Sequence, residues 1–116
     1  KEGSGCSLAN FAEMVAMAAE RYGVHALGIG SDLCQDQPDS VVEWMRNGRW
    51  SIERDFGEGS AEQPGFPPQP NWFEGIKDFP NIAVGLAKVG FSADEIASIM
   101  GLNWLRFYEQ NFRAYA

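Results

Sequence analysis

The 116 residues allow one domain at most, with a core of modest size. Apolar residues make up 45% of the chain and charged residues 22%, a balance typical of globular rather than disordered proteins. The net charge of −7 repels phosphate backbones and anionic lipid, so nucleic acids and membrane surfaces are poor candidate partners.

The sequence carries no membrane-targeting signal and no cysteine framework. No apolar stretch approaches the roughly 20 residues of a membrane-spanning helix, and the N-terminus lacks the apolar core of a signal peptide. Cys6 and Cys34 lie far apart and belong to no Cys-x-x-Cys motif, so we expect two reduced thiols in a cytoplasmic protein. Because the chain begins at Lys1 and not at Met, we interpret it as a fragment or a processed chain.

The first predicted element is an amphipathic helix over 7–23. Its apolar residues recur three or four positions apart: Leu8, Phe11, Met14, Val15, Ala18 and Tyr22. Ser7 suits the N-cap of this helix and Gly23 suits the position just after its end. The spacing therefore predicts one helix with a single buried face.

A short apolar run over 24–30 follows at once. It is too short for a helix and too continuously apolar for a half-exposed strand, so we predict a buried parallel strand. Asp32 comes just after this strand, where α/β barrels and doubly wound sheets display catalytic groups. Asp32 is therefore the candidate catalytic residue, and the alternative is that it caps the turn after the strand.

The residues from 33 to 77 are loop-rich, and we expect them to lie over the active-site face. A short helix is predicted from Pro38 to the Asn47-Gly48 stop, and a Gly- and Pro-rich stretch follows it. Aromatic residues interrupt this stretch, so we expect an ordered loop packed by its own side chains rather than a linker. Its acidic residues are interpreted as a solvated face rather than a cation site: Glu43, Glu53, Asp55, Glu58 and Glu62.

The last part of the chain, 78–116, is predicted to be helical. Asp78 suits the N-cap and Pro80 the first turn of a helix that ends at Gly90. A capping box of Ser92 and Glu95 opens the next helix.

Gly101 is predicted to interrupt that helix, and a last helix follows from Leu102 to Tyr115. We expect the cluster Trp104–Phe107 to pack in the core rather than to form a ligand cage. Asn103, at the entry of this last helix, is expected to tie it to a barrel through its amide.

Two separated motifs resemble a known enzyme family. The first reads His-x-x-Gly-Ile-Gly-Ser-Asp over 25–32, and the second reads Gly-Phe-Ser-x-x-Glu-Ile-x-x-Ile-Met-Gly-x-Asn-Trp-Leu-Arg-Phe over 90–107. In this order they resemble the C-terminal third of the membrane (renal) dipeptidases of the amidohydrolase superfamily. The resemblance runs from Phe11 to Phe112. It implies an α/β fold class, namely the last strand and flanking helices of a (β/α)8 TIM barrel, mostly helical as an isolated chain.

The resemblance also implies an activity. The family hydrolyses small dipeptides through a water that bridges two zinc ions, and the position that matches its proton-handling acid is Asp32. The family's zinc ligands lie on earlier strands, so the resemblance implies that this chain alone binds no zinc and is inactive. Its partners would be the N-terminal part of the barrel, or further copies of the chain in a homo-oligomer, with a dipeptide as substrate of the assembled enzyme.

Other residues near the first motif are given structural roles. His25, the single histidine, begins the strand at the end opposite to a barrel's site, so we do not interpret it as a metal ligand. Cys34 is expected to be a buried or half-buried thiol, because no histidine lies near it in sequence to activate it. Most relatives read Asp-(Phe or Tyr)-Asp-Gly where this chain has Asp32-Leu33-Cys34-Gln35, so the substrate preference is not carried over. The alternative function is a non-enzymatic helical module that binds another protein.

Overall fold

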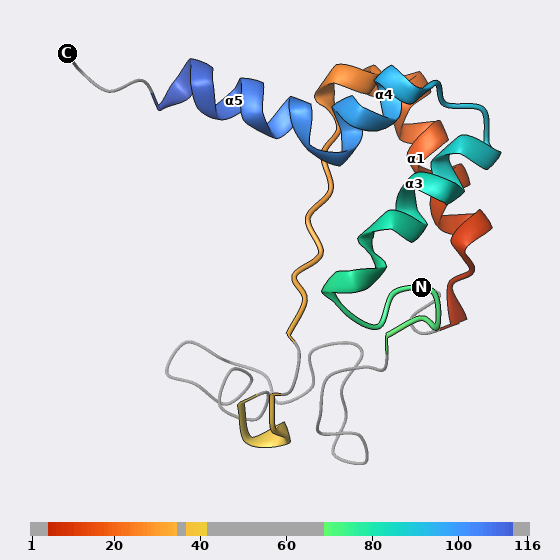
Figure 1. The fold of residues 1–116 in the computed structure, drawn as a ribbon, viewed down its shortest axis with the longest axis vertical. Helices are drawn as coiled ribbons and strands as arrows, with labels where there is room; N and C mark the ends of the chain where they lie inside the picture. The colour runs from red at the N-terminus through yellow and green to blue at the C-terminus, as the bar shows by residue number, and fades with distance from the viewer. Residues whose placement is uncertain (1–4, 35–36, 42–68, 113–116) are drawn as a thin grey trace.

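The computed structural model describes residues 5–34, 37–41 and 69–112, which are mostly helical, as expected for the isolated chain (Figure 1). In chain order the elements are α1 (Leu8–Tyr22), η2 (Val24–Ala26), η3 (Ile76–Asp78), α3 (Phe79–Lys88), α4 (Ala93–Ala97), η4 (Ser98–Leu102) and α5 (Asn103–Asn111). Elements η2 and η3 are 3-10 turns, and η4 is a π-helical turn. Within these ranges, no helix has the length and apolar character needed to cross a membrane.

Helix α1 forms where the amphipathic pattern predicts a helix. Ser7 Oγ accepts a hydrogen bond from the backbone N–H of Asn10 (3.1 Å), so it is the N-cap. Gly23 has a φ of +82° and donates its N–H to the Ala19 carbonyl (2.8 Å), which ends the helix. These two caps fix where α1 begins and ends, and α1 then packs against α3.

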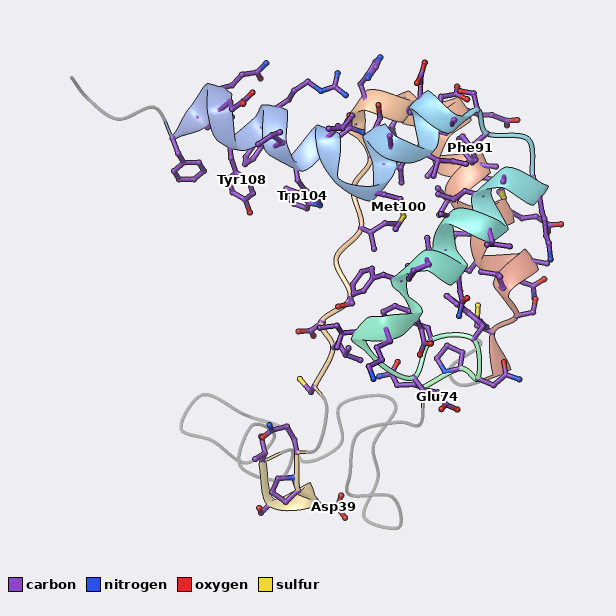
Figure 2. All side chains as sticks on the ribbon, viewed as in Figure 1. Asp39, Glu74, Phe91, Met100, Trp104 and Tyr108 are labelled. Atoms are coloured by element: carbon purple, nitrogen blue, oxygen red, sulfur yellow. The ribbon has the colours of Figure 1, made fainter. Side chains whose placement is uncertain are left out.

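The core lies where α1, α3 and the α4–η4 region meet. Five buried apolar residues form one cluster: Val15, Phe73, Ile82, Leu86 and Ile99. Leu86 and Ile99 are fully buried, and Figure 2 shows the side chains that surround this region. Because the cluster is small, each of its members carries a large share of the apolar burial that stabilises the fold.

The predicted strand over 24–30 does not form. Val24–Ala26 make a 3-10 turn, in which the Leu27 N–H donates to the Val24 carbonyl (3.2 Å). The chain then leaves this turn in extended form, and none of the described residues forms a strand (Figure 1). An extended segment becomes a sheet strand only when a neighbouring strand bonds its backbone. The described residues supply no such neighbour, so the strand predicted over 24–30 is not formed among them.

Asp78 caps a different turn from the predicted one. Its Oδ2 accepts hydrogen bonds from the backbone N–H groups of Glu74 (2.8 Å) and Gly75 (2.9 Å), and its side chain makes no capping bond to α3. Since η3 continues directly into α3, the free N–H groups that need a cap lie one turn earlier than the sequence suggests. Pro80 does lie in the first turn of α3.

The C-terminal helices follow one another with a π-helical turn between them. Ser92 and Glu95 form the predicted capping box at α4, with the Ser92 N–H donating to Glu95 Oε2 (2.8 Å) and the Glu95 N–H donating to Ser92 Oγ (3.4 Å). Gly101 lies inside η4, so the predicted interruption is a π-turn rather than a break. Beyond it, α5 runs outward from the body formed by α1, α3 and α4 (Figure 1).

Several predicted features fall on residues that the structure does not describe. Residues 39–41 are helical, whereas the remainder of the helix predicted from Pro38 to Asn47 lies outside the described ranges. The Gly- and Pro-rich loop and the acidic run over 43–62 also lie outside them.

Glu95 predicts a pH dependence of stability. Hydrogen bonds from the Ser92 backbone and hydroxyl lower the pKa of its carboxyl below the ordinary value. A carboxyl with a lowered folded-state pKa stabilises the fold above its unfolded pKa, and this contribution is lost as the pH falls through the folded-state pKa. We expect acid to lower the urea midpoint followed by circular dichroism, and Glu95→Gln to reduce this pH dependence. An unchanged pH dependence in Glu95→Gln would show that other groups are responsible.

Candidate functional site

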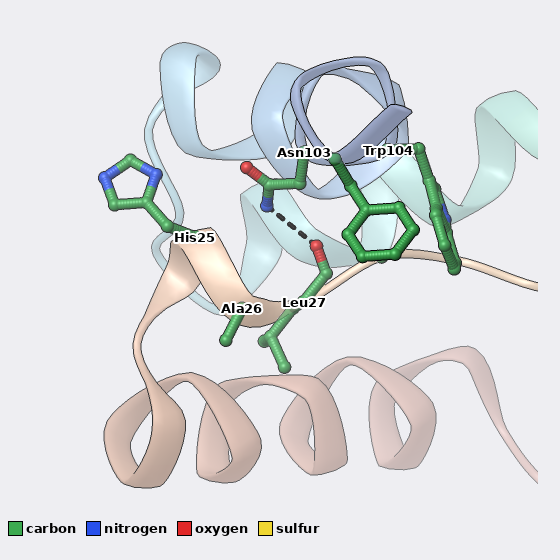
Figure 3. Close-up of a pocket in the computed structure, with 7 residues that line it drawn as sticks. His25, Ala26, Leu27, Asn103 and Trp104 are labelled. Atoms are coloured by element: carbon green, nitrogen blue, oxygen red, sulfur yellow. Dashed lines mark hydrogen bonds between the residues drawn. The ribbon is translucent and has the colours of Figure 1, made fainter. Parts of the chain in front are cut away.

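The candidate site is the contact between the extended segment, residues 27–34, and the start of α5. Asn103, the first residue of α5, donates from its Nδ2 to the carbonyls of Val24 (2.8 Å) and Leu27 (2.7 Å). Figure 3 shows this amide between the two elements. Asn103 therefore ties the start of α5 to residues 24–27, and the carbonyls that it binds have no partner strand among the described residues.

Trp104 extends the same contact by one more residue pair. Its Nε1 donates to the carbonyl of Ile29 (3.1 Å), two residues beyond the Leu27 carbonyl held by Asn103. The indole lies directly against Gly28, where an added Cβ would lie 2.5 Å from Trp104 Nε1. A side chain at this position would push the indole away, so Gly28 is required for the Trp104 hydrogen bond.

Arg106 orients the Asn103 amide. Its Nη2 donates to Asn103 Oδ1 (2.7 Å) and to Ser98 Oγ (3.3 Å), and its Nε donates to the Leu102 carbonyl (3.3 Å). Because a guanidinium has only donors, it faces the amide oxygen and leaves the amide nitrogen to serve the extended segment. Nη1 of Arg106 lies 3.5 Å from Nδ1 of His25, which places the exposed histidine at the edge of this network.

A pocket of about 370 Å³ opens beside this contact (Figure 3). Its walls come from η2, the extended segment and α5: His25, Ala26, Leu27, Gly28, Asn103, Trp104 and Phe107. The lining is apolar and aromatic apart from the imidazole of His25 and the amide of Asn103. The pocket therefore suits an apolar or aromatic group.

Asp32 stands away from this pocket, farther along the extended segment. Its backbone is left-handed, with a φ of +48°, a conformation that Asp and Asn adopt more readily than most residues. The residue is exposed. It lines neither the pocket at Asn103 nor a second pocket, of about 390 Å³, that includes its neighbour Ser31. The structure therefore presents Asp32 to solvent at the end of the extended run.

The described residues do not bring metal ligands together. Among them, no group of three or more His, Cys, Asp or Glu side chains is placed to hold a metal ion. Cys6 and Cys34 are free thiols. Cys34 is exposed, so the expectation of a buried or half-buried thiol is wrong. The extended segment leads away from the core, and the described residues form no sheet that would cover Cys34.

The expected core cluster Trp104–Phe107 is also exposed. Trp104 keeps 42% of its surface accessible and Leu105 keeps 52%. Four rings contact one another in a row, three on α5 and one just beyond its end, and we call them the aromatic face of α5: Trp104, Phe107, Tyr108 and Phe112. Since α5 runs outward from the body, these rings cover each other rather than the core.

Sequence reasoning missed the roles of Trp104 and Arg106. Asn103 and Arg106 are three positions apart on one helix, and this spacing puts their side chains on one face. The contact between Arg106 and Asn103 could therefore have been predicted from their spacing in the sequence. The contact of Trp104 with Ile29 has no sequence signal, because the two residues lie 75 positions apart.

Asn103 predicts a loss of stability on substitution. We expect Asn103→Ala to lower the free energy of unfolding by about 2–4 kcal/mol, since it removes three hydrogen bonds of about 0.5–1.5 kcal/mol each. Two are donated to the carbonyls of Val24 and Leu27, and one is accepted from Arg106 Nη2. The measurement is urea unfolding followed by tryptophan fluorescence. Asn111→Ala is the matched control, because Asn111 donates only to the Phe107 carbonyl of its own helix (2.8 Å). Equal effects of the two substitutions would contradict the role assigned to Asn103.

No protein-family profile, curated protein or solved structure matches this chain. The resemblance to the membrane dipeptidases thus rests on the motif residues themselves and remains a prediction.

Proposed function

We propose that this chain is the C-terminal part of a zinc-dependent dipeptidase of the amidohydrolase superfamily. One observation carries the proposal: the two motifs that resemble this family lie against each other. Asn103 and Trp104, from the motif over 90–107, donate to the carbonyls of Leu27 and Ile29, from the motif over 25–32. The contact between the two motifs supports the proposal, because it joins the residues that carry the resemblance in one structural unit.

Asp32 is the residue to which we assign proton transfer. An exposed carboxylate at the end of an extended segment is free to approach a substrate bound by another part of the protein. Such a carboxylate takes a proton from an attacking water and returns it to the amine that leaves when the peptide bond is cleaved. The left-handed backbone at Asp32 supports this role, since unusual backbone conformations cluster at functional sites.

The zinc ions that the resemblance implies find no ligand set among the described residues. We therefore assign the ligands to the N-terminal part of the barrel, and we expect the 116-residue chain alone to hydrolyse no dipeptide. The substrate class is small dipeptides.

The test begins with the coding sequence upstream of the Lys1 codon. We expect an open reading frame that encodes a His-x-Asp motif followed by further histidines and a glutamate, the ligand types that zinc prefers. We expect the protein expressed from the complete frame to hydrolyse dipeptides and to lose this activity when a chelator removes its metal. A stop codon directly upstream of Lys1, or a complete protein without peptidase activity, would overturn the proposal.

The second candidate is a helical module that binds another protein. The aromatic face of α5 favours it, because exposed aromatic rings that lie together are enriched at protein interfaces. Phe112 keeps 70% of its surface accessible, more than any other residue of this face. A complete reading frame without zinc-ligand motifs, together with binding of a partner that Phe112→Ala abolishes, would favour this candidate over the dipeptidase.

A further inference from the structure

A hydrogen bond from Trp104 holds the extended segment on its way to Asp32. Trp104 Nε1 donates to the carbonyl of Ile29 (3.1 Å), three residues before Asp32. This bond lies two residues closer to Asp32 than the bond from Asn103 to the Leu27 carbonyl. Because three residues of extended chain span at most about 10 Å, a shift of the Ile29 carbonyl also shifts the backbone of Asp32.

The indole of Trp104 is itself held by its neighbours. It stacks on the ring of Tyr108, with centroids 6.0 Å apart and planes 23° apart, and it meets the ring of Phe107 edge-on at 6.1 Å. Its Nε1 edge lies against Gly28, where an added Cβ would lie 2.5 Å from Nε1. An indole placed by these contacts holds the Ile29 carbonyl in one position.

Asp32 lies between two residues that are anchored to the core. The side chains of Ile29 and Leu33 both pack against the buried core cluster. The Leu33 N–H donates to Ser31 Oγ (3.3 Å), which closes a turn around Asp32. The carboxylate of Asp32 remains exposed, so the two anchors set where it points.

We propose that Trp104 is a positioning residue for proton transfer by Asp32, an inference that rests on the proposed dipeptidase function. A general base must come within about 2.6–3.2 Å of the group whose proton it takes. A misplacement of about 1 Å can lower the rate about 10²-fold. Trp104 transfers no proton itself, because its one polar hydrogen is bound to the Ile29 carbonyl. It acts by holding the backbone that carries the carboxylate.

Trp104→Phe tests this role, because it removes the indole N–H and keeps an aromatic ring. In the complete protein we expect kcat for a small dipeptide to fall about tenfold, with KM and zinc content close to wild type. Trp72→Phe is the matched control. Trp72 Nε1 also donates to one backbone carbonyl, that of Cys6 (2.8 Å), which lies outside the extended segment. This control should leave kcat within about twofold of wild type.

A double substitution separates positioning from a general loss of structure. Asp32→Asn leaves no base to position, so adding Trp104→Phe to it should not lower kcat further. A purely structural role of Trp104 would lower kcat by the same factor in both backgrounds.

Gly28→Ala disturbs the same contact from the other side, because its Cβ would displace the indole. We expect it to lower kcat as Trp104→Phe does. Gly30→Ala is its control, since a Cβ at Gly30 meets no atom within 4 Å.

The 116-residue chain offers a measurement that needs no activity. In ¹⁵N relaxation by NMR, we expect Trp104→Phe to increase the picosecond–nanosecond mobility of residues 30–32, and Trp72→Phe to leave it unchanged. Equal mobility in wild type and Trp104→Phe would overturn the positioning role. So would an active complete protein in which Trp104→Phe leaves kcat unchanged or lowers it equally in both backgrounds. A complete protein without peptidase activity would instead overturn the proposed function, and this inference with it.

Discussion

Leu86→Ala is expected to lower the free energy of unfolding by about 2–5 kcal/mol, the usual cost of truncating a buried leucine. Leu86 lies on α3, is completely inaccessible to solvent, and belongs to the core cluster with Val15 and Ile99. The expected loss combines the apolar surface returned to water with the cavity that the missing carbons leave. Since single domains are stable by about 5–15 kcal/mol in total, this one change removes a large part of the stability.

Urea unfolding followed by circular dichroism measures this effect, and Val84→Ala is its control. Val84 lies on the same helix but keeps 51% of its surface accessible, so its truncation should change the free energy of unfolding by no more than about 0.5 kcal/mol. The expected order of midpoints is thus wild type and Val84→Ala together, with Leu86→Ala well below them. Equal midpoints for the two variants would show that α3 does not pack in solution as the structure places it.

Local features of this fold are predictable from the sequence because their causes are local. Ser7 caps α1, and Ser92 and Glu95 form the box at α4, since each of these bonds joins residues three positions apart. Gly101, predicted to interrupt the helix, lies within the π-turn between α4 and α5. Asp78 is the exception. Because η3 directly precedes α3, Asp78 accepts hydrogen bonds from the backbone N–H groups of Glu74 and Gly75, before η3, instead of from those of α3.

Features that depend on contacts between distant parts of the chain could not be predicted from one sequence. The run over 24–30 has the composition of a buried strand, but a strand depends on neighbours that the described residues do not contain. The amide of Asn103 and the indole of Trp104 take up part of that missing role by binding carbonyls of the segment. The apolar pattern of α5 likewise predicts burial in the core. Burial requires a neighbouring element to cover the helix, but α5 runs outward from the body and its aromatic face remains accessible.

Asp32→Asn is expected to reduce dipeptide hydrolysis by the complete protein about 10²–10⁴-fold, the range typical of removing a general acid–base group. A carboxamide is not basic near neutral pH, so it cannot take the proton of the attacking water. Asn also tolerates the left-handed backbone that Asp32 adopts, with its φ of +48°, so the fold should be retained. The substitution therefore removes the proposed chemistry while it keeps the local geometry.

The measurement is kcat and KM for a small dipeptide, with circular dichroism and zinc content as tests of an intact protein. Asp39→Asn is the matched control, because Asp39 is exposed and belongs to neither motif. A proton-transfer role requires kcat to fall in Asp32→Asn while KM and zinc content stay close to wild type, since the loss is confined to the chemical step. If Asp32 only caps a turn, Asn serves equally well and kcat does not change. Activity retained in Asp32→Asn would therefore assign Asp32 to the turn and leave proton transfer to another residue.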